Sequence, residues 1–274
     1  MAKKIFSKLL LVIGLLFCFY PLVAGMYDSW LQSQSVSSFA SQMHNSDAAQ
    51  IQEIIDEAHS YNDKLFSLRT GILSPSERSD SENADYNAQL NFSVNGMMGS
   101  LEIPKIGVNL PIYHGTDESV LAKNVGHLQG SSLPVGGSNT RAVLTAHRGL
   151  PTAKLFTRLD EMEKGDQFFL KVGNETLAYE VRKIEVITPD DADQLDPVEG
   201  KDMVTLLTCT PYGINTHRLL VTGERVPYVP GIEETISQQG PSWREVLFAA
   251  LPFLLLAAAL YKPIKKYIRN KKGE

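Results

Sequence analysis

The sequence MVTLLTCTPYGINTHRLLVTGER, residues 203–225, contains two apolar, β-branched segments separated by a short sequence rich in turn-forming residues. Such segments are typical of strands, and Pro-Tyr-Gly is typical of a turn. The stretch predicts two antiparallel strands, 203–208 and 218–225. Because a short connection places the end of one strand beside the start of the next, we expect Cys209 and Arg218 to be neighbours.

Strand-like segments continue upstream as far as residue 97, and they are separated by Pro and Gly. They include GSLEIPKIGVNLPIY (99–113), RAVLTAH (141–147), QFFLKV (167–172) and LAYEVRKIEVI (177–187). In the last of these the apolar phase switches between Val181 and Ile184, which predicts a bulge or a strong twist. A short helical patch is expected at Ala153–Met162. The pattern predicts a mainly β domain, either a barrel or a sandwich.

The segment before this β domain has a different pattern. Residues 31–46 are rich in Gln and Ser and are interpreted as a linker. A helix is predicted after them, with Asp47 as its cap and Gly71 at its end. Its apolar stripe consists of Ile51, Ile54, Ile55, Ala58 and Leu65. Residues 74–89 are polar and are interpreted as an exposed loop.

Both ends of the chain have the composition of membrane segments. Leu9–Tyr27 is an uncharged run of 19 residues that follows three lysines, and this favours an uncleaved anchor. The alternative is a signal peptide cleaved near Gly25. Val246–Tyr261 is a second apolar run of 16 residues, interrupted by Pro252 and followed by a basic tail. A buried core helix is the alternative for this second run, but the basic tail favours a membrane span.

The charge distribution predicts where each part lies. Of 26 Lys and Arg and 31 Asp and Glu, residues 1–26 hold three lysines, and residues 244–274 hold seven basic and two acidic residues. This leaves 16 basic and 29 acidic residues between them, so the middle is a poor binder of nucleic acid. Basic flanks mark the cytoplasmic side of a membrane. We therefore expect both termini to be cytoplasmic and the middle of the chain to be extracellular.

The cysteine content suggests chemistry at Cys209. The only other cysteine, Cys18, lies in the predicted anchor, so Cys209 is a free thiol in an oxidising compartment. A nucleophilic thiol needs a nearby histidine or cation, and an acyl intermediate needs a donor for its oxyanion. Arg218 is the candidate donor, although a surface arginine in an ion pair is an equally good interpretation.

The partner histidine is less clear from the residues alone. His217 is close in sequence, but side chains alternate along a strand, so His217 points away if Arg218 points into the site. His147 ends a predicted strand and opens into a turn, which puts it modestly ahead. His114 and His127 also lie in turn-like sequences and remain possible. A histidine satisfied by backbone hydrogen bonds is the commoner fate of any one of them.

Several motifs together resemble a known family. TLLTC at 205–209 is followed by Arg218, nine residues after its cysteine, and TAHRG lies upstream at 145–149. This combination resembles the signature of the sortases, which are Gram-positive cell-surface cysteine transpeptidases. Longer segments are similar to the pilus-assembling class C branch. They are LEIPKIGVNLPIYHGT (101–116), AHRGLPTAKLFTRLD (146–160) and TCTPYGINTHRLLVTGER (208–225), together with the apolar C-terminal segment.

This resemblance implies a fold and a reaction. The fold would be a closed eight-stranded β-barrel with short helices. Cys209 would be the nucleophile, His147 the acid/base and Arg218 the stabiliser of substrate and oxyanion. The enzyme would cleave an LPXTG-like sorting signal between Thr and Gly and form a thioacyl enzyme. A lysine of the next pilin subunit would then resolve this intermediate, and no cofactor or metal is implied.

The resemblance also suggests a substrate groove near the same strand ends. Thr208, Leu207 and His127 are the candidate substrate-binding residues, although Leu207 fits a buried core equally well. The loops 188–202 and 210–217 are further candidates for its walls. Acidic residues of the first loop could attract a lysine nucleophile, although solvated acidic loops are commoner. These residues are Asp190, Asp191 and Asp193.

One departure from the class C pattern concerns the lid over the active site. Class C sortases usually carry an Asp-Pro-aromatic motif ahead of the first strand. The matching stretch here, residues 72–92, contains Ser74-Pro75-Ser76 and no such motif. We therefore expect the site to be open, or covered by a loose and polar lid.

The expected organisation follows from these observations. It comprises a basic flank (1–8), an anchor (9–27), a linker, helix and degenerate lid region (28–96), a catalytic barrel (97–228), a linker (229–244), a membrane segment (245–261) and a basic tail (262–274). The leading hypothesis is a membrane-anchored, pilin-polymerising sortase. The alternatives are a sortase that anchors surface proteins to peptidoglycan and a non-catalytic membrane-tethered assembly or adhesion protein.

Overall fold

The computed structural model of the chain describes residues 2–68, 79–92, 96–150 and 152–271. The chain forms two compact units. The larger unit, residues 29–239, contains the β-strands and the candidate catalytic residues. The smaller unit consists of residues 1–28 and 240–274.

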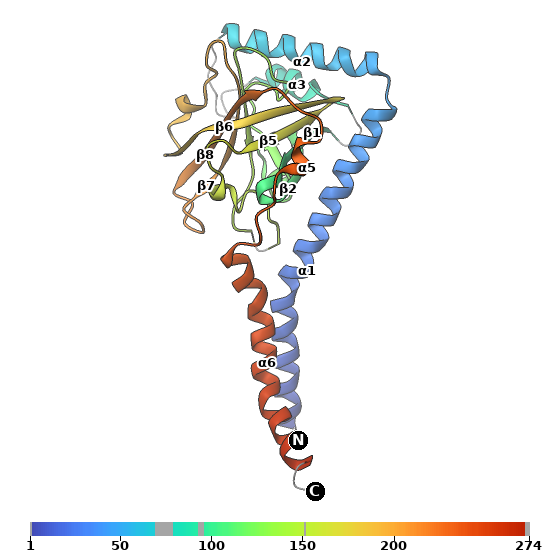
Figure 1. Cartoon of the computed structure of the whole chain (residues 1–274), viewed down its shortest axis with the longest axis vertical. Helices are drawn as coiled ribbons and strands as arrows, with labels where there is room; N and C mark the ends of the chain where they lie inside the picture. The colour runs from blue at the N-terminus through green and yellow to red at the C-terminus, as the bar shows by residue number, and fades with distance from the viewer. Residues whose placement is uncertain (1, 69–78, 93–95, 151, 272–274) are drawn as a thin grey trace. The chain divides into compact units, whose positions relative to one another are not determined.

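Eight strands of the larger unit close into a barrel in the order β1-β2-β3-β4-β7-β8-β6-β5 (Figure 1). They are β1 (Met97–Ile103), β2 (Val108–His114), β3 (Val125–His127), β4 (Thr140–Thr145), β5 (Gln167–Val172), β6 (Glu175–Ile187), β7 (Asp202–Thr210) and β8 (His217–Val226). The β2–β3 and β4–β7 pairs are parallel, and the other neighbours are antiparallel. The predicted closed eight-stranded β-barrel is confirmed.

Two local features shape the wall of the barrel. β6 shifts register against β8 between Val181 and Lys183, which confirms the predicted bulge. In β8, a Cβ on Gly223 would lie 2.6 Å from the ring of Phe168. Glycine at this position therefore makes room for the stacked rings of Phe168 and Tyr179, whose centroids are 5.7 Å apart.

Helix α2 (Ala48–Leu68) lies across one end of the barrel (Figure 1). The predicted cap is present, because a carboxylate oxygen of Asp47 accepts a hydrogen bond from the amide of Ala49 at 3.0 Å. Ile51 is buried, and it belongs to the predicted apolar stripe. On the same helix, Asn62 donates to the carbonyl of Leu133 at 3.1 Å and accepts from its amide at 2.7 Å.

The predicted linker at 31–46 is helical instead, because helix α1 runs over Ala2–Asn45. Its apolar side chains Val36, Phe39 and Met43 are spaced for one helix face and are buried in the main core. Serine hydroxyls donate to the carbonyl four residues earlier, at Ser35, Ser37 and Ser41. These bonds satisfy the hydroxyls within the helix, so the polar composition does not prevent it.

Part of the predicted exposed loop at 74–89 is also helical. Helix α3 (Asp80–Ala88) begins with a capping box, in which Ser79 and Glu82 bond each other's backbone amides. Tyr86 anchors this helix, because its side chain is buried. The capping box is a signal in the sequence that the loop interpretation overlooked. Residues 74–78 lie outside the described part of the chain.

The predicted helical patch at Ala153–Met162 contains only turns and a short 3-10 helix, Leu159–Glu161. Leu155 has a φ of 40°, which a right-handed helix does not allow. The apolar residues of this patch are buried, so their helix-like spacing reflects contacts with the core rather than a helix.

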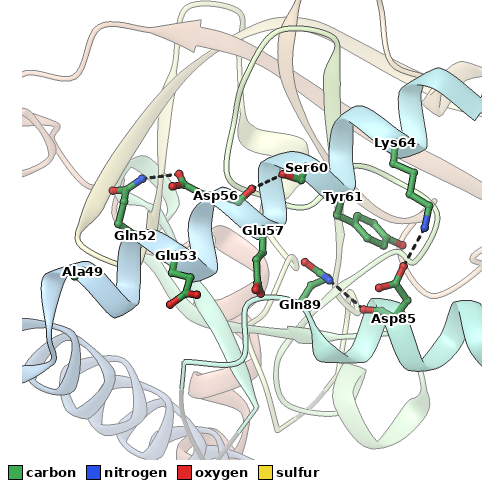
Figure 2. Close-up of a pocket in the computed structure, with 10 residues that line it drawn as sticks. All are labelled: Ala49, Gln52, Glu53, Asp56, Glu57, Ser60, Tyr61, Lys64, Asp85 and Gln89. Carbon is green, nitrogen blue, oxygen red and sulfur yellow. Dashed lines mark hydrogen bonds and ion pairs between the residues drawn. The ribbon is translucent and has the colours of Figure 1, made fainter.

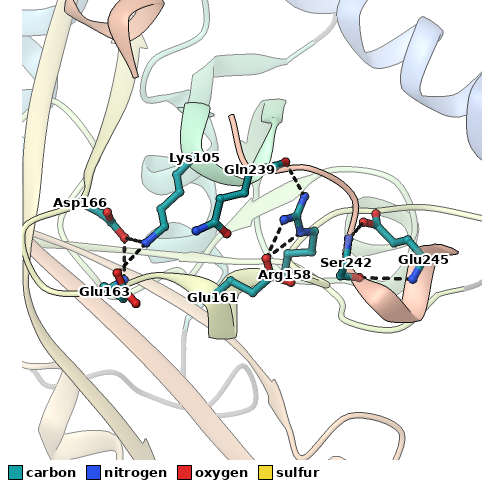
Figure 3. A network of polar contacts seen from close by, with 8 residues as sticks. All are labelled: Lys105, Arg158, Glu161, Glu163, Asp166, Gln239, Ser242 and Glu245. Atoms are coloured by element: carbon teal, nitrogen blue, oxygen red, sulfur yellow. Dashed lines mark hydrogen bonds and ion pairs between the residues drawn. The ribbon is translucent and has the colours of Figure 1, made fainter. Parts of the chain in front are cut away.

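A polar network ties segments of the larger unit together (Figure 3). Lys105 donates to Asp166 at 2.8 Å and to Glu163 at 3.1 Å. Burial alone would lower the pKa of Lys105, but its hydrogen bonds and charge interactions with these two carboxylates raise it. The backbone amide of Gln239 donates to the Lys105 carbonyl at 2.8 Å, and Arg158 donates to the Gln239 carbonyl at 3.4 Å. The segment after β8, which includes α5 (Ile232–Thr235), is therefore attached to the barrel.

In the smaller unit, the first part of α1 and helix α6 (Trp243–Lys271) carry the two apolar segments. Both helices are long and apolar enough to cross a membrane. Phe19 and Phe253 make an edge-to-face contact, with their ring centroids 5.3 Å apart. The length and composition of both helices support membrane anchoring, as the sequence predicts.

Candidate active site

The register of β7 and β8 places Cys209 directly opposite Arg218. This confirms that the two residues are neighbours across an antiparallel pair. Directly paired residues lie on the same face of a sheet, with their Cβ atoms about 5 Å apart. Arg218 donates to the carbonyls of Asn215 at 3.3 Å and His217 at 3.2 Å, so the turn before β8 orients its guanidinium group.

Cys209 and Arg218 lie on the outer face of the barrel. Two residues earlier on β7, Leu207 pairs with Leu220 of β8. Both pack in a small apolar cluster with Val143, separate from the main core. Because side chains alternate along a strand, Cys209 shares the face of Leu207, and Arg218 shares the face of Leu220. The thiol is half-buried and accessible on the outside of the barrel.

His147 reaches the same place from β4, which runs parallel to β7. The last paired residues of these two strands are Thr145 of β4 and Leu207 of β7. Beyond them, the Thr208 hydroxyl donates to the carbonyl of Ala146 at 2.8 Å. The backbone amide of Ala146 also donates to the carbonyl of Leu207 at 3.3 Å, so the segment that carries His147 leaves β4 alongside the end of β7. The structure therefore pairs Cys209 with Arg218 across β7 and β8, and it places His147 in the segment that follows the neighbouring strand β4.

His217 does not join this group. It is exposed, and its Nδ1 lies 2.9 Å from the hydroxyl of Thr216. It pairs with Thr210, one position beyond the pair that Cys209 makes. Alternation along β8 therefore directs His217 and Arg218 to opposite faces, as the sequence predicts.

Arg148, next to His147, makes contacts with the end of β7 that the sequence did not predict. Its buried guanidinium forms an ion pair with Asp160 and donates to the Thr210 hydroxyl at 3.3 Å. It also lies 5.7 Å from the ring centroid of Tyr212. Arg148 thus connects the loop after β4 to the loop after β7. A single arginine in a turn carries no sign in the sequence of these distant partners.

Comparison with known proteins identifies the family. A sortase domain model matches residues 101–226. Sortase D of Bacillus subtilis is 32% identical over 181 residues, which are 64% of this chain and 88% of that protein. This chain belongs to the sortase family. It is therefore a cysteine transpeptidase, which agrees with a free thiol placed beside a histidine and an arginine.

Solved structures similar to this sortase are class C enzymes. Sortase C1 from Streptococcus agalactiae is 44% identical with a TM-score of 0.67, and the match covers 72% of this chain and 100% of that one. Sortase C from Streptococcus pneumoniae is 44% identical with a TM-score of 0.62, and the match covers 71% and 97%. Sortase C-1 from Actinomyces oris is 47% identical with a TM-score of 0.60, and the match covers 65% and 99%.

The candidate substrate-binding residues of the sortase lie in three different environments. Thr208 is buried and its hydroxyl is bonded to the backbone of the neighbouring strand. Leu207 is half-buried in the outer apolar cluster, beneath the loop 188–202. His127 is completely buried, so its ring is not on an accessible wall. A role in substrate binding remains a prediction for all three residues.

His127 belongs to a buried polar cluster with helix α3. Its Nε2 donates to the carbonyl of Ser132 at 2.8 Å, so Nδ1 accepts from the Tyr86 hydroxyl at 2.9 Å. The Tyr86 hydroxyl in turn accepts from the amide of Gly115 at 3.0 Å. Burial lowers the pKa of His127 to about 4, with a smaller contribution from the charge of His114. His127 is therefore neutral at physiological pH and holds α3 on the barrel.

The lid region of the sortase is only partly described. Residues 72–78 lie outside the described part of the chain, so the expectation of an open or loosely covered site is untested there. The aromatic residue of the following helix, Tyr86, packs on His114 and His127. It therefore occupies the α3 contact with the barrel rather than the surroundings of Cys209.

A hollow of about 880 Å³ lies between α2 and α3 (Figure 2). It is lined by Ala49, Gln52, Glu53, Asp56, Glu57, Ser60, Tyr61, Lys64, Asp85 and Gln89. Lys64 and Asp85 form an ion pair across it at 3.5 Å. None of these residues is a catalytic candidate. The reaction is better assigned to the outer face of the barrel around Cys209.

Proposed function

We propose that this sortase polymerises pilin subunits by cleaving an LPXTG-like sorting signal and joining it to a pilin lysine. The observation that carries the proposal is the pairing of Cys209 with Arg218, with the segment that carries His147 following the neighbouring strand β4. The similar class C structures support the choice of substrate, since the Streptococcus pneumoniae sortase C is described as having pilin substrate specificity.

The first half-reaction forms the acyl enzyme. The Cys209 thiol gives its proton to His147, and its sulfur attacks the threonine carbonyl carbon of the sorting signal. Arg218 stabilises the negative charge that develops on the carbonyl oxygen. The bond between threonine and glycine then breaks. The proton on His147 goes to the leaving glycine amine, and a thioester on Cys209 remains.

The second half-reaction transfers the acyl group. The neutral amine of a pilin lysine attacks the thioester carbonyl, and the carbon–sulfur bond breaks. A proton from the new ammonium group passes through His147 to the departing sulfur, which restores the thiol. The product is an isopeptide bond between two subunits. No step requires a metal or a cofactor.

The two apolar helices set the location of this reaction. Basic residues flank the apolar segment of each helix on the side of the nearer chain terminus, and such flanks face the cytoplasm. We propose that α1 and α6 anchor the enzyme with both termini inside the cell. The barrel would then be outside, where the pilin substrates are assembled.

The proposal is tested with the full-length enzyme in membranes, a pilin that carries an LPXTG-like signal, and gel analysis in SDS. We expect SDS-resistant ladders with the wild type and with the control Cys18→Ala, because Cys18 lies in α1, outside the site. Cys209→Ala should give none. Ladders at wild-type levels with Cys209→Ala would refute catalysis. Attachment to peptidoglycan without ladders would favour the anchoring alternative.

A further inference from the structure

Glu118 contacts the candidate catalytic histidine. We propose that Glu118 is a positioning residue that holds the His147 ring with a proton on Nε2 and Nδ1 free to exchange a proton with Cys209. This inference rests on the proposed function, because it takes His147 as the acid/base of the transpeptidation. It assigns the neighbouring helix α4 (Glu118–Leu121) a part in the reaction.

The hydrogen bond determines which nitrogen is protonated. A carboxylate oxygen of Glu118 lies 3.1 Å from Nε2 of His147. An ionised carboxylate can only accept, so Nε2 is the donor. In a neutral imidazole the other nitrogen, Nδ1, then carries the lone pair. A general base needs that lone pair directed at the proton it removes, and an acceptor on the other nitrogen fixes both the tautomer and the ring orientation.

Packing places Glu118 at the end of β4. Gly126 of β3 pairs with Thr145 of β4, two residues before His147. A Cβ on Gly126 would lie 2.9 Å from a methyl carbon of Leu121, so glycine allows α4 to lie close against β3. The α4 helix therefore sits over the strand end that carries His147. The packing of α4 against β3, together with the Glu118–His147 contact, therefore supports the position of Glu118 beside the ring.

Hydrogen bonds also hold the backbone of the His147 segment in place. The His147 carbonyl accepts a hydrogen bond from the amide of Phe156 at 3.1 Å. The next residues are held by the buried Arg148 and by a bond from Gly149 to the Thr157 hydroxyl at 3.1 Å. With the backbone of His147 held in place, the remaining freedom is rotation of its side chain. The Glu118 contact restricts that rotation.

The expected effect is moderate. The side chain of Glu118 is 80% exposed and that of His147 is 30% exposed, so water screens the pair in the free enzyme. A bound sorting signal would displace part of this water and strengthen the contact during the reaction. We expect removal of the carboxylate to lower kcat by about fivefold, far less than loss of a buried triad carboxylate.

The test compares Glu118→Ala, Glu118→Gln and the control Asp117→Asn in the full-length enzyme. Asp117 is the adjacent carboxylate, so its variant removes the same charge from the same helix end. Release of the glycine fragment from an LPXTG-type peptide gives kcat and KM for the first half-reaction. Nitrogen-15 NMR of labelled histidines reports the His147 tautomer, and His147→Gln assigns its signal.

We expect Glu118→Ala to lower kcat about fivefold with KM within about twofold, and to lose the preference for a proton on Nε2. Glu118→Gln keeps an acceptor oxygen, so it should keep the tautomer and an intermediate kcat. Asp117→Asn should match the wild type. An unchanged kcat in Glu118→Ala, an equal loss in Asp117→Asn, or a wild-type proton on Nδ1 would overturn the inference.

These results separate the inference from the proposed function. If the wild type releases the glycine fragment and His147→Gln does not, the role of His147 stands whatever the Glu118 variants do. If His147→Gln is as active as the wild type, the proposed function fails first and Glu118 loses its role with it.

Discussion

At the scale of single residues, the position of Arg218 is compatible with its predicted role as stabiliser of the oxyanion. It is paired with Cys209 across β7 and β8, and its guanidinium group is held by carbonyls of the preceding turn. A donor beside a nucleophile is suited to stabilising an oxyanion, and this role remains a prediction for Arg218. His217, one residue away, has the opposite orientation and contacts its own loop.

Arg218→Lys should lower kcat/KM for sorting-peptide cleavage by about 100-fold. Lysine keeps the charge but loses the planar group that the turn carbonyls orient. His217→Ala is the matched control, and we expect its kcat/KM within about twofold of the wild type. Equal losses in the two variants would contradict the assignment of strand faces.

At the scale of elements, the segment after the first apolar run is part of a continuous helix. Residues 29–45 of α1 are polar on one side, but Val36, Phe39 and Met43 enter the core of the larger unit. Phe39 also lies 6.0 Å from the ring of Phe92. Residues 29–45 of α1 therefore contribute to the stability of the larger unit. The residues before them in the same helix form the predicted anchor.

Phe39→Ala should lower the free energy of unfolding by about 3 kcal/mol, because it removes a large buried ring. Thermal unfolding of the full-length protein in detergent would measure the change. Ser37→Ala, on the exposed side of the same helix, should change stability by less than about 0.5 kcal/mol. If Phe39→Ala left the midpoint of thermal unfolding unchanged, residues 31–46 would behave as the linker that their composition suggests.

At the scale of the whole molecule, closure of the barrel assembles the site. Residues 147 and 209 are far apart in sequence, and the parallel pairing of β4 with β7 brings the segment after β4 alongside the end of β7. The same closure buries His127 on β3, where Nδ1 contacts Tyr86 of α3 and Nε2 contacts the carbonyl of Ser132. The pairing of the barrel strands therefore determines both the contact with α3 and the position of the residues predicted to form the site.

The stability of the protein should fall as the pH drops from about 6.5 to about 4. His127 has a pKa of about 4 in the folded state, compared with the ordinary 6.5, so the unfolded chain binds a proton that the folded protein does not. Stability should be unaffected by this group above pH 6.5. The loss should approach about 3 kcal/mol near pH 4.

Chemical unfolding at several pH values would measure this loss. Burial also lowers the pKa of His114, which acts in the same direction. His127→Gln should flatten the dependence between pH 6.5 and 4, whereas His44→Gln, at an exposed position, should leave it as in the wild type. A dependence that stays equally steep without His127 would place the titrating group elsewhere.

The sequence by itself determined the local features of this sortase. Alternating β-branched segments predicted strands, and the short connection between two of them predicted the Cys209–Arg218 pair and the orientation of His217 away from it. The switch of apolar phase predicted the bulge in β6. These features depend on residues close together in the chain, where spacing alone fixes the geometry.

Only the tertiary structure decided the long-range features. The residues alone left His147, His114 and His127 open as partners of Cys209. The parallel pairing of β4 with β7 brings the segment that carries His147 alongside the end of β7, whereas His127 is completely buried. The same packing made the polar segment of α1 helical and brought Glu118 to His147. Such contacts join strands and helices far apart in the chain, and their energy comes from burial that local sequence does not encode.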